Sequence, residues 1–146
     1  MLKKTISYTN FNGEERTEDF FFHLSTPEIT RMQIKFKGDI AEYAKKLQQA
    51  GDQDGMITFV EELMLSSYGE KTDDGKSFIK TKEVRTKFEY SQAYAELFEE
   101  LLTSPQKAQQ FGQGLVEGAK APNSEAAKLI ADHQAKKAGN VTSITE

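Results

Sequence analysis

The segment from Ala50 to Glu61 comes closest to a metal-binding spacing in this 146-residue sequence. Counted from Ala50, it matches most of the calcium-binding loop of an EF-hand, through the residues Asp52, Asp54, Gly55, Ile57 and Glu61. Ala50 itself stands where the first carboxylate ligand belongs, so one oxygen ligand and one negative charge are lacking. We therefore interpret the segment as a connection between two helices, capped by Asp52 or Asp54. A calcium-responsive helical module is kept as an alternative hypothesis.

Gly75-Lys76-Ser77 has the order of residues that ends a phosphate-binding P-loop. The glycine that should stand five positions before Gly75 is Glu70, and Asp73 and Asp74 would repel phosphate groups. No strand is predicted before this segment. We therefore interpret it as a surface turn.

Two pairs of neighbouring carboxylates, Glu61-Glu62 and Glu99-Glu100, have the residue type that acid–base catalysis uses. Neighbours on a helix point about 100° apart, so neither pair converges on one substrate bond. The two histidines, His23 and His133, lie far apart in the sequence without a nearby orienting carboxylate. We expect solvated helix faces for the acids and surface or strand-end positions for the histidines. No catalytic residue, metal ligand or cofactor is predicted.

The composition narrows the classes of function. The sequence has no cysteine, which excludes disulfides, thiol catalysis and zinc sites built on thiolates. Its net charge of −4 argues against broad nonspecific nucleic-acid binding, which needs a cationic surface. No run approaches the roughly 18 apolar residues of a membrane span, and no apolar stretch of a secretion signal follows the N-terminus. We expect a cytosolic protein that binds neither nucleic acid nor membrane.

The first 24 residues predict a β-hairpin. Apolar and polar residues alternate from Leu2 to Tyr8, and Asn10 to Gly13 has the composition of a turn. A second strand is predicted from Glu14 to Leu24, with one face formed by Phe20, Phe22 and Leu24. Phe21 points to the other face, which makes it the member of the Phe20–Phe22 run that we expect to contact a partner.

The rest of the chain predicts five or six helices. Start signals stand at Ser25 (with Pro27 and Glu28), Asp39, Thr81, Ser91 and Ser104-Pro105. The segment 56–68 has the widest apolar face and is predicted to be the central helix, and 69–76 is predicted to be a polar turn. The last helix contains Gly112, Gly114 and Gly118, each of which weakens it by about 1 kcal/mol relative to alanine. We therefore expect that helix to depend on a packing partner.

The predicted fold class is mainly α, a small helical domain with an N-terminal β-hairpin. Residues 1–120 form the predicted domain. Residues 121–146, which have the helix breaker Pro122 at their second position and are rich in alanine and lysine, form a predicted mobile or weakly helical tail.

Three segments, residues 3–20, 67–80 and 91–101, resemble the tail assembly chaperones of long-tailed, siphovirus-type bacteriophages that infect Gram-positive bacteria. Together with the order of elements between them, the resemblance covers residues 2–116. The candidate partner-binding residues lie within or beside these segments, and they are Phe11, Phe21, Tyr68 and Phe78.

The resemblance implies a non-enzymatic protein of the host bacterial cytoplasm that binds the tape-measure protein, recruits tail-tube subunits and is absent from the finished virion. It also implies that this chain is the short form of a protein made in two lengths by ribosomal frameshifting. Self-association and association with the longer form are further candidate interactions. A structural head–tail connector or minor tail component is the alternative within phage biology.

Overall fold

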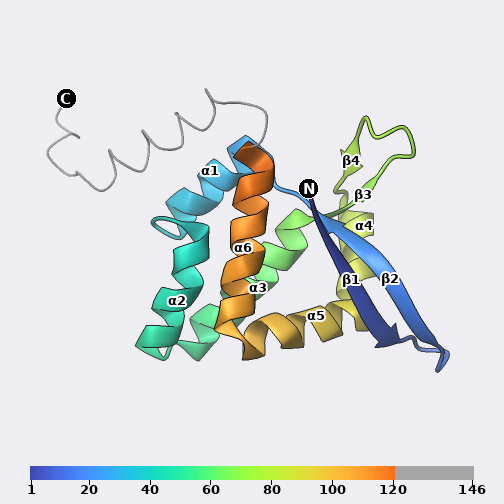
Figure 1. Ribbon diagram of the computed structural model, residues 1–146, viewed down its shortest axis with the longest axis horizontal. Coiled ribbons are helices and arrows are strands. Elements are labelled where there is room, and N and C mark those ends of the chain that lie inside the picture. The colour runs from blue at the N-terminus through green and yellow to red at the C-terminus, as the bar shows by residue number, and fades with distance from the viewer. Residues whose placement is uncertain (121–146) are drawn as a thin grey trace, which may run out of the picture.

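The structure, a computed structural model, describes residues 1–120 (Figure 1). Four strands and six helices follow one another in these residues, in the order β1 (Leu2–Thr9), β2 (Glu15–Phe22), α1 (Thr26–Lys35), α2 (Ile40–Ala50), α3 (Gln53–Ser67), β3 (Tyr68–Lys71), β4 (Phe78–Ile79), α4 (Lys82–Glu89), α5 (Gln92–Thr103) and α6 (Pro105–Lys120). The predicted mainly α fold with an N-terminal hairpin is confirmed. The predicted tail, residues 121–146, and His133 lie outside the described residues, and the division into domain and tail stays a prediction.

The strands β1 and β2 form a long antiparallel hairpin, paired from Leu2 opposite Phe22 to Thr9 opposite Glu15. The predicted alternation is confirmed. Phe22 and Leu24 are fully buried and Phe20 is half-buried on the inner face, whereas the serine and threonine side chains of β1 are exposed on the outer face. Figure 1 shows the turn of this hairpin projecting away from the helices.

The helices begin where the sequence signals predict. Ser25 and Glu28 form a reciprocal capping box at α1, and the side chains of Asp39, Asp52, Thr81 and Ser91 accept backbone N–H groups at the starts of α2 to α5. The helix α3 begins at Gln53, three residues earlier than predicted, because Asp52 caps it. Phe59, Val60 and Leu63 on this helix are fully buried, which confirms its central position.

One prediction was wrong between α3 and α4. Tyr68 does not end the helix but begins strand β3, and the segment predicted to be a polar turn forms a second hairpin with β4. This hairpin extends the sheet in the order β1-β2-β3-β4, through Phe21 opposite Gly69 and Phe22 opposite Tyr68. A side chain at Gly69 would clash, because its Cβ would lie 2.6 Å from the Phe78 ring and 2.8 Å from the Ile79 carbonyl oxygen.

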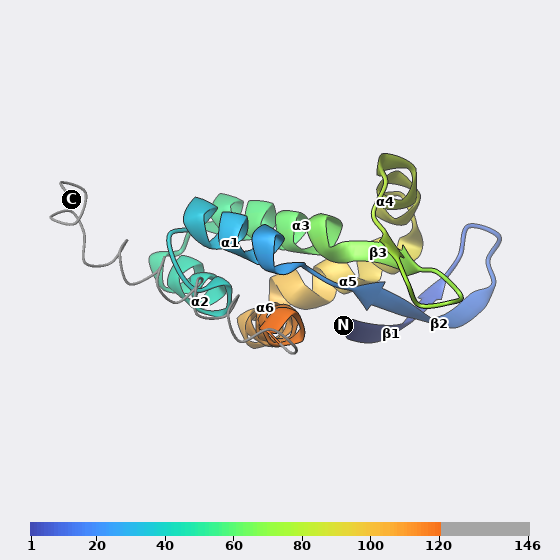
Figure 2. The same cartoon turned by 90° about the horizontal axis from the view of Figure 1, so that it is seen from above.

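The last helix, α6, lies beside α2 and in front of α3 in the view of Figure 1, and Figure 2 shows the same arrangement from above. Its glycines allow close approach. A Cβ on Gly112 would lie 3.2 Å from Ile40, and one on Gly114 would lie 3.1 Å from Leu2. The expected packing partners of this glycine-rich helix are therefore α2 and the N-terminal strand.

Candidate partner-binding surfaces

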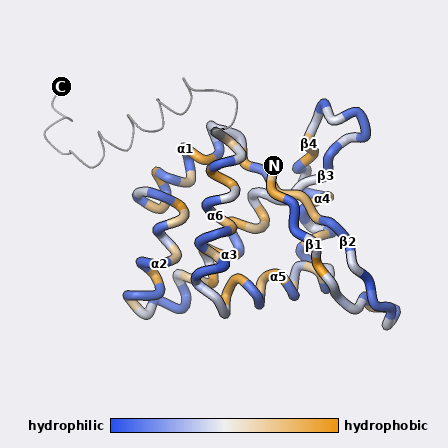
Figure 3. Tube along the Cα trace, viewed as in Figure 1, coloured by the Kyte–Doolittle hydropathy of each residue, from blue (hydrophilic) through white to orange (hydrophobic). Residues whose placement is uncertain are grey.

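Phe11 occupies the tip of the β1–β2 hairpin with 77% of its surface exposed. The turn beneath it is well organised: the Asn10 side chain accepts the N–H groups of Asn12 and Glu14 at 2.9 Å each, and Gly13 has a positive φ of 81°. The far ends of both hairpins are mostly hydrophilic in Figure 3, so Phe11 is an aromatic ring in polar surroundings. Its exposure is therefore fixed by an ordered turn.

Phe21 lies half-buried on the outer face of the sheet, opposite to Phe20 and Phe22. The Lys71 ammonium lies 5.6 Å from the centre of its ring, within the range of a cation–π contact. Part of this ring is open to solvent, as a partner contact would require.

Tyr68 contributes to the core, since 9% of its surface is exposed. Its ring stacks on Phe88 with centroids 4.0 Å apart and also contacts Phe22 edge-on. Burial, followed by the nearby charges of Glu70 and Glu18, raises the pKa of its hydroxyl to about 12. The structure thus places Tyr68 inside the fold and not on its surface.

Phe78 is half-buried on β4, where its ring meets the His23 ring edge-on at 6.0 Å. His23 stands directly after β2, as expected for a strand-end histidine, and its backbone N–H donates to the Ser67 carbonyl at 2.8 Å. Burial, the N-terminal ammonium and Lys80 lower the pKa of His23. The four candidate residues are therefore separated: Phe11 lies at one tip, Tyr68 in the core, and Phe21 and Phe78 near the junction of the hairpins.

Sequence reasoning missed Tyr90, which is 73% exposed at the end of α4. The available signal was its position between the helix that ends at Glu89 and Ser91, the cap of the next helix. A residue between two helices belongs to the packed face of neither, so its side chain is free to point into solvent. Tyr90 provides a second exposed aromatic for comparison with Phe11.

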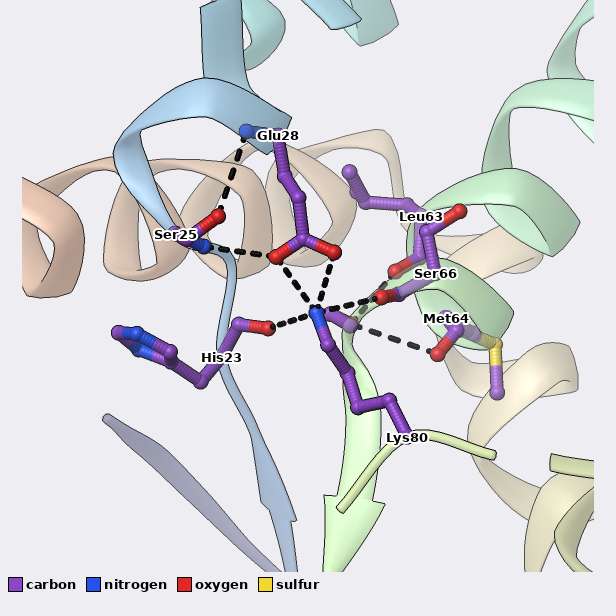
Figure 4. A network of polar contacts seen from close by, with 8 residues as sticks. His23, Ser25, Glu28, Leu63, Met64, Ser66 and Lys80 are labelled. Atoms are coloured by element: carbon purple, nitrogen blue, oxygen red, sulfur yellow. Dashed lines mark hydrogen bonds and ion pairs between the residues drawn. The ribbon is translucent and has the colours of Figure 1, made fainter. Parts of the chain in front are cut away.

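A polar anchor that the sequence did not predict fixes the β3–β4 hairpin to the body (Figure 4). The Lys80 ammonium donates to both Glu28 carboxylate oxygens at 2.7 and 2.8 Å and to the carbonyls of His23 and Ser66 at 3.0 and 3.1 Å. Burial alone would raise the pKa of Glu28, but hydrogen bonds from Lys80 and Ser25 outweigh it and lower that pKa. Lys80 therefore joins β4, the end of β2, α1 and α3.

The structure does not support the calcium loop or the P-loop. Residues from Gln53 onward are helical, and the Asp52 carboxylate accepts the Gly55 N–H at 2.9 Å as a helix cap. A strand does precede Gly75-Lys76-Ser77, contrary to the prediction, but the next element is strand β4 and not the helix that a P-loop requires. Within residues 1–120 no cluster of three or more His, Asp or Glu side chains has metal-binding geometry.

The paired carboxylates lie on helix faces as expected. Glu62 accepts a hydrogen bond from Lys35 at 2.7 Å, and Glu100 pairs with Lys4 at 3.4 Å, while Glu61 and Glu99 are exposed. These acids join elements of the fold and contribute negative surface.

The structure is that of a small, mainly helical protein that presents two hairpins, one of them with an exposed aromatic residue at its tip. Residues 1–141 match the family model described as phage tail assembly chaperone, and the chain belongs to this family. Membership assigns it a chaperone role in phage tail assembly and confirms the resemblance at the level of the family. Neither a curated protein nor a solved structure matches the chain.

None of the helices in the described part of the chain has the length and apolar character needed to cross a membrane.

Proposed function

We propose that this chaperone binds the tape-measure protein and recruits tail-tube subunits in the cytoplasm of a Gram-positive host, for a long-tailed phage, without catalysis and without entering the finished virion. Family membership supports a role in tail assembly. The observation that carries a binding mechanism is Phe11, an aromatic side chain 77% exposed on an ordered, projecting turn. Burying such a ring against a partner removes apolar surface from water with little loss of backbone freedom.

Phe21 and Phe78 are proposed as secondary contacts, because both rings are half-buried near the junction of the hairpins. Self-association and association with a longer, frameshifted form are further proposals for the same protein. Neither needs a catalytic group.

Co-expression of the chain with the tape-measure and tail-tube proteins of its own phage tests the proposal. We expect a complex with at least one of them, and we expect Phe11→Ser to weaken it by at least about tenfold, as for an aromatic at the centre of an interface. Tyr90→Ser is the matched control, since it removes an equally exposed aromatic from a different surface.

Repeated failure to form a complex with either soluble partner would contradict the proposed partners. Purified virions separate the chaperone from the alternative of a head–tail connector or minor tail component, because only a structural component remains in the particle. Detection of the chain in virions at a fixed copy number would favour that alternative.

A further inference from the structure

The strand β1 is an edge of the sheet in the described residues, since β2 is its neighbour on one side and no strand pairs with the other. The hydrogen bond from the Asn10 N–H to the Glu14 carbonyl, at 2.8 Å, establishes which alternate residues of β1 are hydrogen-bonded to β2. In this register the even-numbered residues of β1 exchange hydrogen bonds with β2. The odd-numbered residues Lys3, Thr5, Ser7 and Thr9 therefore direct their N–H and C=O groups to the outer edge.

A groove of about 380 Å³ lies between β1 and α5, and a second of about 320 Å³ is lined by both strands of the hairpin and by Glu96 of α5. Ser7 and Glu96 line both grooves. The free edge of β1 thus borders the first groove, here called the channel, whose other wall is helical. An extended chain fits such a channel, because a strand added to β1 would satisfy the unpaired backbone groups.

The helical wall of the channel is acidic. Glu96 and Glu99 are exposed along it, and Glu100 is already paired with Lys4 at 3.4 Å. In the second groove the one cation, Arg16, pairs with Glu18 at 3.7 Å. The channel therefore has uncompensated negative charge on the side of α5, which favours a cationic occupant.

We propose that an extended, cationic segment of an unassembled tail protein binds in this channel as an added antiparallel strand on β1. The proposal rests on the proposed function and names the surface and the chemistry of its ligand. Side chains of the added strand that point toward α5 are lysine or arginine, facing Glu96 and Glu99. Those on the opposite face lie beside the exposed Thr5, Ser7 and Thr9, and β-branched residues suit these positions.

A second copy of this chain fits the channel less well, although β1 itself contains Lys3 and Lys4. In a two-fold antiparallel pair of β1 strands, both α5 helices lie on the same face of the joined sheet. Glu96 and Glu99 of one copy then approach the same residues of the other, and like charges repel. The acidic wall therefore favours a foreign strand over self-pairing.

A fluorescent eight-residue peptide in which valine alternates with lysine is the probe. We expect this peptide to bind the full chain and to bind more weakly as the salt concentration increases. A peptide that alternates valine with glutamate should displace it only at a much higher concentration. N-methylation of the valines removes the N–H groups that face β1 when the lysines face α5. That change should weaken binding by at least about tenfold, whereas N-methylation of the lysines alters the opposite edge and should change it by less than about threefold.

Protein variants test the same contact from the other side. Ser7→Pro removes an outward N–H from β1, and its matched control Thr17→Pro removes one from the opposite residue of β2, on that strand's other edge. We expect Ser7→Pro to weaken peptide binding at least about tenfold and Thr17→Pro to change it by less than about threefold. Glu96→Gln with Glu99→Gln should weaken binding about tenfold, and Glu42→Gln with Glu83→Gln, exposed acids on other helices, should not.

Absence of peptide binding would overturn the proposal, and so would equal loss on N-methylation of either edge, since charge alone would then explain the contact. A dimer of the wild-type chain in sedimentation that Ser7→Pro converts to a monomer would show that a second copy occupies the edge. Failure of this proposal can be distinguished from failure of the proposed function. If Ser7→Pro still forms the complex with the tail proteins, the chaperone role stands and this surface does not carry it.

Discussion

The β1–β2 hairpin and the β3–β4 hairpin share one sheet, yet different parts of the chain hold them in place. The first pairs over eight residues of each strand and packs its inner face against α5 and α6. The second has strands of four and two residues and touches the sheet through two residue pairs. Beyond Tyr68, which is buried in the core at the start of β3, this hairpin is held by the Lys80 anchor at its base and by a turn in which Asp74 accepts hydrogen bonds from Thr72 and Lys76.

The two hairpins therefore differ in what their attachment allows. A hairpin held along its length can present a large apolar residue at its tip, because the tip contributes little to the pairing beneath it. A hairpin held at its base gains order from polar contacts within its own turn, and that turn is hydrophilic. The aromatic tip and the open edge are both on the first hairpin, which makes it the candidate for partner binding.

The largest expected effect is at the point where the hairpins meet. Phe22 is fully buried, pairs with Tyr68, and contacts the rings of Phe88 and Phe111. Phe22→Ala should lower the free energy of unfolding by about 3–5 kcal/mol. Phe21→Ala, the neighbour on the outer face, should lower it by clearly less in the same urea titration. Equal losses would mean that the inner face is not what holds the first hairpin.

The next effect concerns the anchor alone. Lys80→Met keeps the length of the side chain but removes the ammonium that donates to Glu28 and to two carbonyls, so that the Glu28 carboxylate keeps only the Ser25 N–H as a donor. We expect a loss of about 1–3 kcal/mol in the free energy of unfolding. Hydrogen exchange should increase in β3 and β4 and stay unchanged in β1. Increased exchange across both hairpins would show that they do not depend on separate contacts.

A smaller effect should appear on acidification. The pKa of Glu28 is lowered in the folded chain, so its contribution to stability is complete above the pKa of the unfolded state. That contribution is lost as the pH falls below about 4.3 toward the lowered value. Glu28→Gln should therefore show a smaller decrease in unfolding free energy than the wild type between about pH 6 and about pH 3. Identical pH profiles for Glu28→Gln and the wild type would show that the Lys80–Glu28 contact does not contribute to the loss of stability in acid.

The smallest effect on stability is expected at the tip of the first hairpin. Phe11→Ser should change the free energy of unfolding by less than about 0.5 kcal/mol, as for an exposed side chain with little packing. A thermal melt measures this, with Tyr90→Ser as the comparison. A drop of several degrees would show that Phe11 supports the hairpin and is not held out for a partner.

The sequence predicted the parts of the fold that depend on local signals. The alternation from Leu2 to Tyr8 and the caps at Ser25, Asp39 and Ser91 are visible without any knowledge of tertiary contacts. The strands β3 and β4 are too short to alternate, and they form because Gly69 allows β4 to approach and Phe21 and Phe22 provide an edge. Such pairing depends on partners that are distant in the sequence, which a local pattern cannot show.

Whether the candidate residues are exposed or buried could be predicted from the sequence only in part. The polar turn around Phe11 indicated exposure, whereas Tyr68 belongs to the aromatic core through its stacking on Phe88, twenty positions later. The Lys80 anchor could not be predicted from local patterns either, since it joins Lys80 to Glu28, 52 positions apart in the sequence. The acidic channel required both the edge position of β1 and the placement of α5 beside it.

The contact of Leu2 with the backbone of α6 at Gly114 has a consequence for the order of events on the ribosome. The first strand to be synthesised cannot bury its end until the last described helix has left the exit tunnel. At about 5–20 residues per second, synthesis from the end of β1 to the end of α6 lasts between about 5 and about 20 seconds. During it the inner face of the first hairpin, including Ile6 and Phe22, lacks part of its cover. Folding of this chaperone is therefore completed only after most of the chain has been translated, and until then its own nascent hairpin is itself open to association.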